Sequence, residues 1–79
     1  MDIIHDKTLI KNLKIDAKAV GIPSGAANIF IEKTLTTASQ TLKNKKIITN
    51  QDLDRAIIKE LKKYSTDFAY VYENRDKII

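Results

Sequence analysis

The chain has 79 residues, no cysteine, and 14 lysines and arginines against ten acidic residues, for a net charge of +4. This length predicts one small domain spanning residues 1–79, and the missing cysteines exclude disulfides and thiolate metal sites and favour a cytoplasmic setting. No apolar run approaches the ~18 residues of a membrane span, and the charges scattered through residues 1–11 are unlike a signal peptide. We therefore expect no membrane contact.

The first predicted helix covers residues 7–19, with Asp6 suited to cap it. Its apolar side chains recur at helical spacing and form one stripe: Leu9, Ile10, Leu13, Ala17 and Val20. Lysines at steps of three and four occupy the other face, hereafter the lysine row: Lys7, Lys11, Lys14 and Lys18. Upstream, residues 1–4 are apolar enough for a strand fragment, which would need a partner strand.

Residues 21–25 hold both glycines and the only proline, and they mark the clearest break in the chain. The helix start that follows could hold phosphate. However, the segment lacks the Lys-Ser/Thr ending of a P-loop and follows no strand, so a simple helix–helix turn is favoured. The second helix is predicted to start after Ser24 and to run to about Lys43, with this predicted buried stripe: Ala27, Phe30, Ile31, Thr34, Leu35, Ala38 and Leu42.

A third helix is predicted from Thr49 or Asn50 to Tyr64, and Asp52 stands where a capping box places its acidic residue. Its inner stripe is Leu53, Ala56, Ile57, Leu61 and Tyr64. In the loop before it, Ile47 and Ile48 are expected to anchor the chain in the core.

The last predicted helix starts after Ser65 or Thr66, with Tyr70 the best candidate for an exposed aromatic contact. Its stripe is Phe68, Val71, Tyr72 and Arg75. Together the patterns predict an all-α, compact four-helix domain with three main helices and a C-terminal fourth.

Catalytic and metal chemistry find little support in this chain. His5 is the only histidine, and no second metal ligand is spaced to join it. Asp52 and Asp54 lie two apart, which points them in different directions, and Ser24 has no histidine base. We expect a non-enzymatic protein with no catalytic residue and no metal.

The loop lysines Lys43, Lys45 and Lys46 allow two interpretations: a contact for a nucleic-acid backbone, or a loop that only keeps the protein soluble. Readers of base edges rely on arginine, and this chain has only Arg55 and Arg75. Nucleic acid is therefore the less favoured partner.

Several segments, in this order and spacing, resemble the ATP-cone, the small nucleotide-sensing domain of ribonucleotide reductases and related repressors. They are Leu9–Leu13, Ala19–Ile22, the second-helix stripe, Ile48-Thr49 before a polar pair and Leu53, and finally Ala69-x-x-Tyr72-x-x-Arg75. The resemblance spans about residues 5–76. It implies an ATP-cone-like helical core and a purine nucleotide, ATP or dATP, as ligand.

Carried over residue by residue, the resemblance offers Lys7 or Thr8, Lys11 and Thr49 as neighbours of phosphate or ribose. ATP-cones begin with a β-hairpin, and residues 1–4 are too short to supply it. The resemblance therefore implies that a partner chain completes the pocket, or that the domain has lost nucleotide binding and kept protein–protein contacts.

A second resemblance is to the histone fold, which implies a basic DNA-binding dimer. Residues 45–49, Asp52, Leu53 and the Ala56-Ile57 pair resemble its second loop and third helix. A histone central helix needs about 27 residues, or some 40 Å, whereas Ser24 to Lys43 offers 20. The ATP-cone resemblance is therefore favoured.

Overall fold

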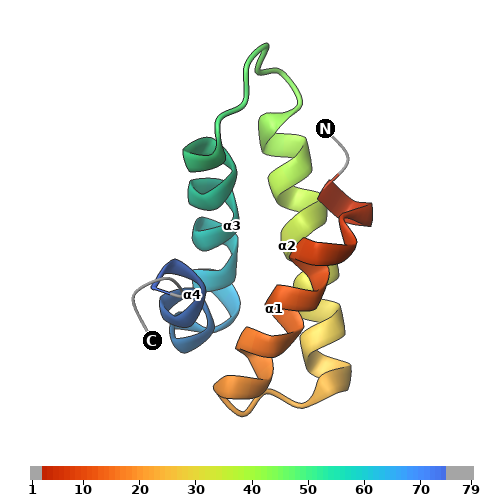
Figure 1. Ribbon diagram of the computed structural model, residues 1–79, viewed down its shortest axis with the longest axis vertical. Helices are drawn as coiled ribbons and strands as arrows, with labels where there is room; N and C mark the ends of the chain where they lie inside the picture. Colours follow the sequence, from red (N-terminus) through yellow and green to blue (C-terminus); the bar gives the residue numbers. More distant parts are fainter. Residues whose placement is uncertain (1–2, 75–79) are drawn as a thin grey trace.

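The computed structural model describes residues 3–74, and four α-helices account for most of them. The elements in chain order are a short 3-10 helix η1 (Ile3–His5), α1 (Lys7–Ala19), α2 (Ser24–Leu42), α3 (Asn50–Tyr64) and α4 (Thr66–Glu73). No strand occurs within the described residues. The predicted all-α four-helix domain is confirmed (Figure 1).

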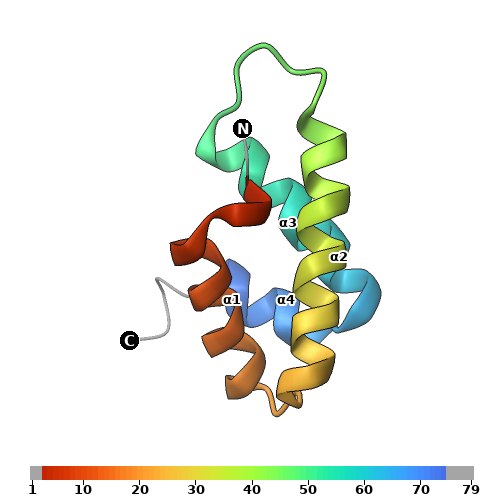
Figure 2. The ribbon, with the colours of Figure 1, turned by 90° about the vertical axis from the view of Figure 1, so that its right-hand side faces the viewer.

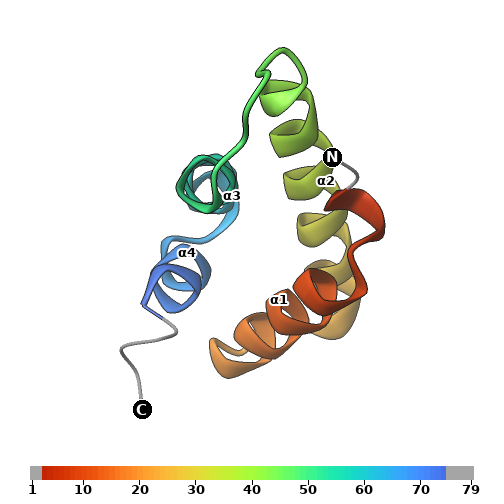
Figure 3. The same ribbon diagram turned by 45° about the horizontal axis from the view of Figure 1, so that its top comes forward.

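Helix α2 is the central element of the fold. It packs against α1 and η1 on one side and against α3 on the other, while α4 closes the domain against α3 and α1. Figure 3 shows α1 and α2 on one side of the molecule and α3 and α4 on the other. Within the described part of the chain, no Cα atom of α1 lies within 8 Å of one in α3. Groups at the starts of α1 and α3 are thus held apart by α2.

Three helix starts carry the side-chain caps that the sequence predicted. The carboxylate of Asp6 accepts a 3.1 Å hydrogen bond from the backbone N–H of Leu9, and the Ser65 hydroxyl accepts one of 3.2 Å from Phe68. Thr49 and Asp52 form a reciprocal capping box at the start of α3. Each cap satisfies an N–H group that the first helical turn leaves unpaired.

The turn between α1 and α2 is fixed by a glycine in the left-handed region. Gly21 has φ +81°, and its N–H donates to the carbonyl of Lys18 while the N–H of Ile22 donates to Ala17, both at 3.0 Å. This pair of bonds is the Schellman motif that ends many helices. It turns the chain within a few residues and brings Ile22 against the core.

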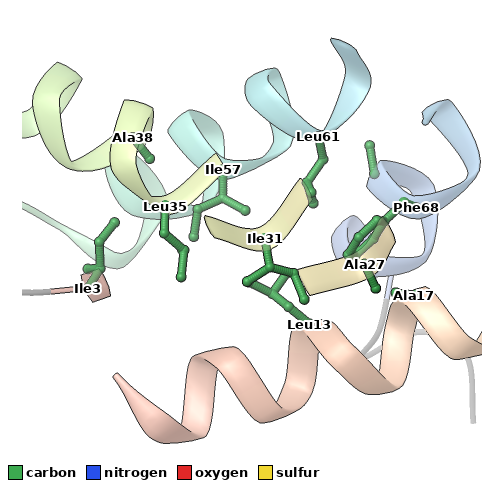
Figure 4. Close-up of a cluster of buried hydrophobic side chains, with 11 residues drawn as sticks. Ile3, Leu13, Ala17, Ala27, Ile31, Leu35, Ala38, Ile57, Leu61 and Phe68 are labelled. Atoms are coloured by element: carbon green, nitrogen blue, oxygen red, sulfur yellow. The ribbon is translucent and has the colours of Figure 1, made fainter. Parts of the chain in front are cut away.

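The core lies along α2 and draws side chains from every helix (Figure 4). The predicted stripes supply most of it, and Ile3 and Ala69 join them. The buried members of the core are Ile3, Leu13, Ala17, Ala27, Ile31, Leu35, Ala38, Ile57, Leu61, Phe68 and Ala69. Three buried polar residues join them: Asp16, Thr34 and Glu60. Burial of the two carboxylates was not predicted.

Two local predictions were wrong. Residues 3–5 form a 3-10 turn rather than a strand fragment, and Ile3 is buried against α2; residues 1–2 lie outside the described part. Ile47 does not anchor its loop, because 81% of its surface is exposed, although Ile48 is half-buried.

The ends of the predicted stripes also differ from the core. Tyr64 is 37% exposed and stacks on the ring of Phe30 with centroids 5.1 Å apart. Arg75, the last member of the α4 stripe, lies outside the described residues. Tyr70 is exposed as predicted.

Candidate ligand-binding site

The roomiest of the pockets described here lies between the second half of α1 and the start of α2. Its volume is about 460 Å³, within the range of small-molecule sites. It is called the α1–α2 pocket below, and its lining residues are Lys14, Lys18, Ile22, Ser24, Ala27 and Asn28.

This pocket follows from the local sequence. The Schellman turn at Gly21 folds the first turn of α2 back beside the last two turns of α1, and Ile22 and Ala27 line the pocket with apolar surface. Lys14 and Lys18 are four residues apart, so they lie one above the other on the same face of α1. Both are exposed, which leaves two ammonium groups over an apolar floor.

The start of α2 is a second source of positive charge beside the pocket. Pro23 precedes α2 and makes no side-chain cap, and the first turn of α2 holds no acidic residue. The positive end of the α2 dipole therefore adds to the charge of the two lysines instead of being neutralised. Ser24 and Asn28 contribute neutral hydrogen-bonding groups to the same wall.

A second hollow, of about 230 Å³, continues along the α1–α2 seam and shares Lys14 and Asn28 with the first. Its other lining residues are mostly apolar: Ile4, Ile10, Ile31, Glu32 and Leu35. The seam thus has a cationic end, at Lys18, and an apolar end where Glu32 is the only carboxylate of the lining.

The structure separates Thr49 from the other residues that the family resemblance suggested for a nucleotide. Lys7, Thr8 and Lys11 are exposed on the first turns of α1 and line neither hollow of the seam. Thr49 caps α3, and Figures 1 and 3 show the starts of α1 and α3 on opposite sides of α2. The Thr49 hydroxyl and N–H are both used within the capping box.

Two of the loop lysines come together at the other end of the molecule. Lys43 and Lys45 line a recess of about 220 Å³, while Lys46 is exposed beside them in the chain. The other residues of this upper recess are Ile3, Ser39, Gln40, Leu42 and Ile48.

Lys45 is held in place by the cap of α3. Its ammonium donates to the Asp52 carboxylate at 3.1 Å, and the other oxygen of that carboxylate accepts the Thr49 N–H at 3.1 Å. The Thr49 backbone bond first, and then Lys45, lower the pKa of Asp52 below its ordinary value of 3.8. Asp52 is thus a structural carboxylate, as its position in the sequence predicted.

Nothing in either hollow of the seam combines a nucleophile with a base. Ser24 has no histidine near it in the lining, and His5 is exposed in η1. Within residues 3–74, no three His, Cys, Asp or Glu side chains gather as a metal site would require. The arrangement is suited to holding an anion with an apolar body.

Sequence reasoning identified the lysine row but not which of its members face a pocket. The signal that could have found them is position: Lys14 and Lys18 lie in the last two turns before the glycine turn, where the next helix must fold back. Asn28 carries no such signal.

Comparison with known proteins adds no relative: no family model, no curated protein and no solved structure matches this chain. Across residues 3–74, no helix combines the length and apolar character needed to cross a membrane.

Proposed function

We propose that this protein is a non-enzymatic, regulatory binding module that takes a purine nucleotide, ATP or dATP, in the α1–α2 seam. The observation that carries the proposal is that two members of the lysine row, Lys14 and Lys18, line one apolar-floored pocket. Phosphate groups pair with lysine ammonium groups, and the flat faces of a purine favour apolar walls.

The seam has separate places for the two halves of such a ligand. The phosphates lie against Lys14 and Lys18 beside the start of α2, where the helix dipole favours negative charge. The base lies toward Ile10 and Ile31, where the carboxylate of Glu32 can accept a hydrogen bond from a purine amino group.

Binding is weak in the isolated chain and becomes tight with a protein partner. Both lysines are exposed, so water screens their charge, and no further element within residues 3–74 covers the seam. A partner chain laid over it would exclude water and strengthen the same contacts.

Titration of ¹⁵N-labelled protein with ATP tests the proposal, because the amide shifts locate the ligand. We expect shifts that cluster between residues 14 and 32. Replacing Lys14 and Lys18 together by alanine weakens binding about tenfold or more, the effect of losing ~1.4 kcal/mol of contact energy. ATP is recovered unchanged, since the seam has no hydrolytic group.

The matched control is the Lys7→Ala, Lys11→Ala double variant, which removes the same charge from the same lysine row. It keeps most of the affinity if the phosphates lie at Lys14 and Lys18. If this control loses more affinity than the first variant, the phosphates lie where the ATP-cone resemblance put them and the seam assignment is wrong. If millimolar ATP shifts no amide, nucleotide binding is contradicted and the alternative of a protein interaction domain without nucleotide is favoured.

The basic DNA-binding dimer remains the third alternative and has its own signature. Binding of duplex DNA should then weaken by about 0.9 log units per phosphate contact for each log unit of salt. A flat response rules that alternative out.

A further inference from the structure

The α2–α3 loop, residues 43–49, is the most prominent protrusion of the molecule. In Figures 1 and 2 it rises beyond the ends of α2 and α3 at the top of the domain. Ile47 lies within it and is the most exposed large apolar side chain of the described part of the chain, at 81%. An isoleucine held in water forgoes the favourable transfer that burial would give.

A recess lies beside this exposed side chain. It is the upper recess, of about 220 Å³, and three apolar residues line it: Ile3, Leu42 and Ile48. The other four lining residues are polar: Ser39, Gln40, Lys43 and Lys45. A protruding apolar side chain next to a hollow with this mixed lining is a surface that an amphipathic helix can bind, because one apolar residue of the helix contacts the three apolar wall residues and another packs on the protrusion.

Positive charge surrounds both features. Lys43, Lys45 and Lys46 fall within four consecutive residues, and the loop itself contains no carboxylate. The nearest acidic residue along the chain is Asp52, and its charge is already paired with Lys45 at 3.1 Å. A partner that meets this surface must therefore bring negative charge of its own.

The start of α3 keeps the surface in one arrangement. The Thr49–Asp52 capping box fixes the end of the loop through two 3.1 Å bonds, and the Lys45–Asp52 pair ties the middle of the loop to the same helix. Preorganisation of this kind lowers the entropy lost when a partner binds.

We infer that the α2–α3 loop and the upper recess dock an acidic amphipathic helix of a protein partner. One apolar residue of that helix fills the recess, a second packs on Ile47, and its carboxylates pair with Lys43 and Lys46. This surface lies at the opposite end of α2 from the α1–α2 pocket, so it is independent of the proposed nucleotide site.

The probe is a synthetic amphipathic peptide with leucine on one face and glutamate on the other, titrated into ¹⁵N-labelled full-length chain. Its control is the same peptide with lysine in place of glutamate. We expect amide shifts confined to residues 3, 39–49 and their neighbours with the acidic peptide, and none with the basic peptide. Shifts with both peptides, or with neither at millimolar concentration, overturn the inference.

Two exposed isoleucines provide the matched variants. Ile47→Ser should weaken binding of the acidic peptide about tenfold or more, and its exposure means that the fold is retained. Ile29→Ser, at an isoleucine of α2 that is 52% exposed, should leave the affinity unchanged. Equal losses in both variants would show non-specific apolar contact and overturn the inference.

Replacing Lys43 and Lys46 by glutamine should also weaken binding of the acidic peptide and make that binding less dependent on salt. Duplex DNA and vesicles containing phosphatidylserine complete the test. If either of them produces the same shifts and Ile47→Ser does not affect its binding, the loop is a phosphate-binding face and the protein-docking inference is wrong.

Discussion

The two connections on either side of α2 differ in length and in where they place an isoleucine. The α1–α2 connection, residues 20–23, is short and closed by backbone hydrogen bonds, and it holds Ile22 against the core. The α2–α3 connection, residues 43–49, is longer and leaves Ile47 in water. Ile22 in the first connection lines the α1–α2 pocket, whereas Ile47 in the second connection is part of a protrusion.

The difference comes from how each preceding helix ends. Gly21 adopts φ +81°, which lets two hydrogen bonds turn the chain at once and aims the next side chain inward. Lys43 stays in the right-handed region at the end of α2, so the chain continues outward before it returns to Thr49. The glycine turn thus brings Ile22 against the core at once, whereas the α2–α3 connection leaves Ile47 in water and returns to a half-buried position only at Ile48.

The largest expected effect is a difference in stability between a variant in the core and a variant in the α2–α3 loop. Ile57 is completely buried and ten residues from Ile47. Ile57→Ala should cost about 2–5 kcal/mol of unfolding free energy, because it leaves a cavity between α2 and α3, whereas Ile47→Ala should change it by no more than about 0.5 kcal/mol. Urea denaturation followed by circular dichroism measures both. A cost above 1 kcal/mol for Ile47→Ala would mean that the loop is part of the core after all.

A smaller effect tests the turn that builds the α1–α2 pocket. Gly21→Ala forces a Cβ into the left-handed region and should cost about 1–2 kcal/mol of unfolding free energy. This cost comes from the backbone alone, because apart from its chain neighbours no atom of residues 3–74 lies within 4 Å of that Cβ. Gly25→Ala is the matched control, since Gly25 is helical and its Cβ also meets nothing. Gly25→Ala should raise the free energy of unfolding by up to about 1 kcal/mol, because alanine restricts the conformations of the unfolded chain.

Thermal denaturation of the two variants decides this point. If Gly21→Ala is neutral, the Schellman turn is not what holds Ile22 at the pocket, and the explanation of the difference between the two connections fails. If Gly25→Ala is also destabilised, the loss at Gly21 cannot be assigned to its left-handed backbone.

Helix boundaries were the part of the structure that the sequence predicted best. Asp6, Thr49 and Ser65 are residue types whose side chains accept from the backbone of the next turn, so the starts of α1, α3 and α4 could be predicted from local chemistry alone. The apolar stripes were equally local, because burial follows helical periodicity. The prediction for Ile47 failed because apolar character says nothing about where a loop leads.

The candidate site was harder to predict because it depends on contacts between helices. Lys7, Lys11, Lys14 and Lys18 are equivalent in sequence, and only the packing of the start of α2 against α1 distinguishes the last two. Likewise, the burial of Asp16 and Glu60 depends on neighbouring helices. The nucleotide assignment of Thr49 stays a prediction, and its hydroxyl is engaged in the cap.

The smallest effect concerns the cap that ends the α2–α3 loop, and it depends on pH. The folded-state pKa of Asp52 lies below its ordinary value of 3.8, chiefly because the Thr49 N–H donates to the carboxylate and next because of Lys45. A carboxylate with a lowered folded-state pKa stabilises the native state fully above its unfolded-state pKa, and this contribution is lost as the pH falls through the lower folded-state value. Asp52→Asn should therefore be less stable than the wild type at neutral pH, and the two should converge below pH 3.8.

Urea denaturation of both proteins from neutral pH down to strongly acidic pH measures this convergence. At neutral pH, added salt should reduce the difference in unfolding free energy between the two proteins only in part. Salt screens the exposed Lys45–Asp52 pair but not the hydrogen bond from the Thr49 N–H. A gap that is independent of pH would mean that the carboxylate is not charged in its capping role. The same variant should leave ATP binding unchanged, since the α1–α2 pocket shares no residue with the α3 cap.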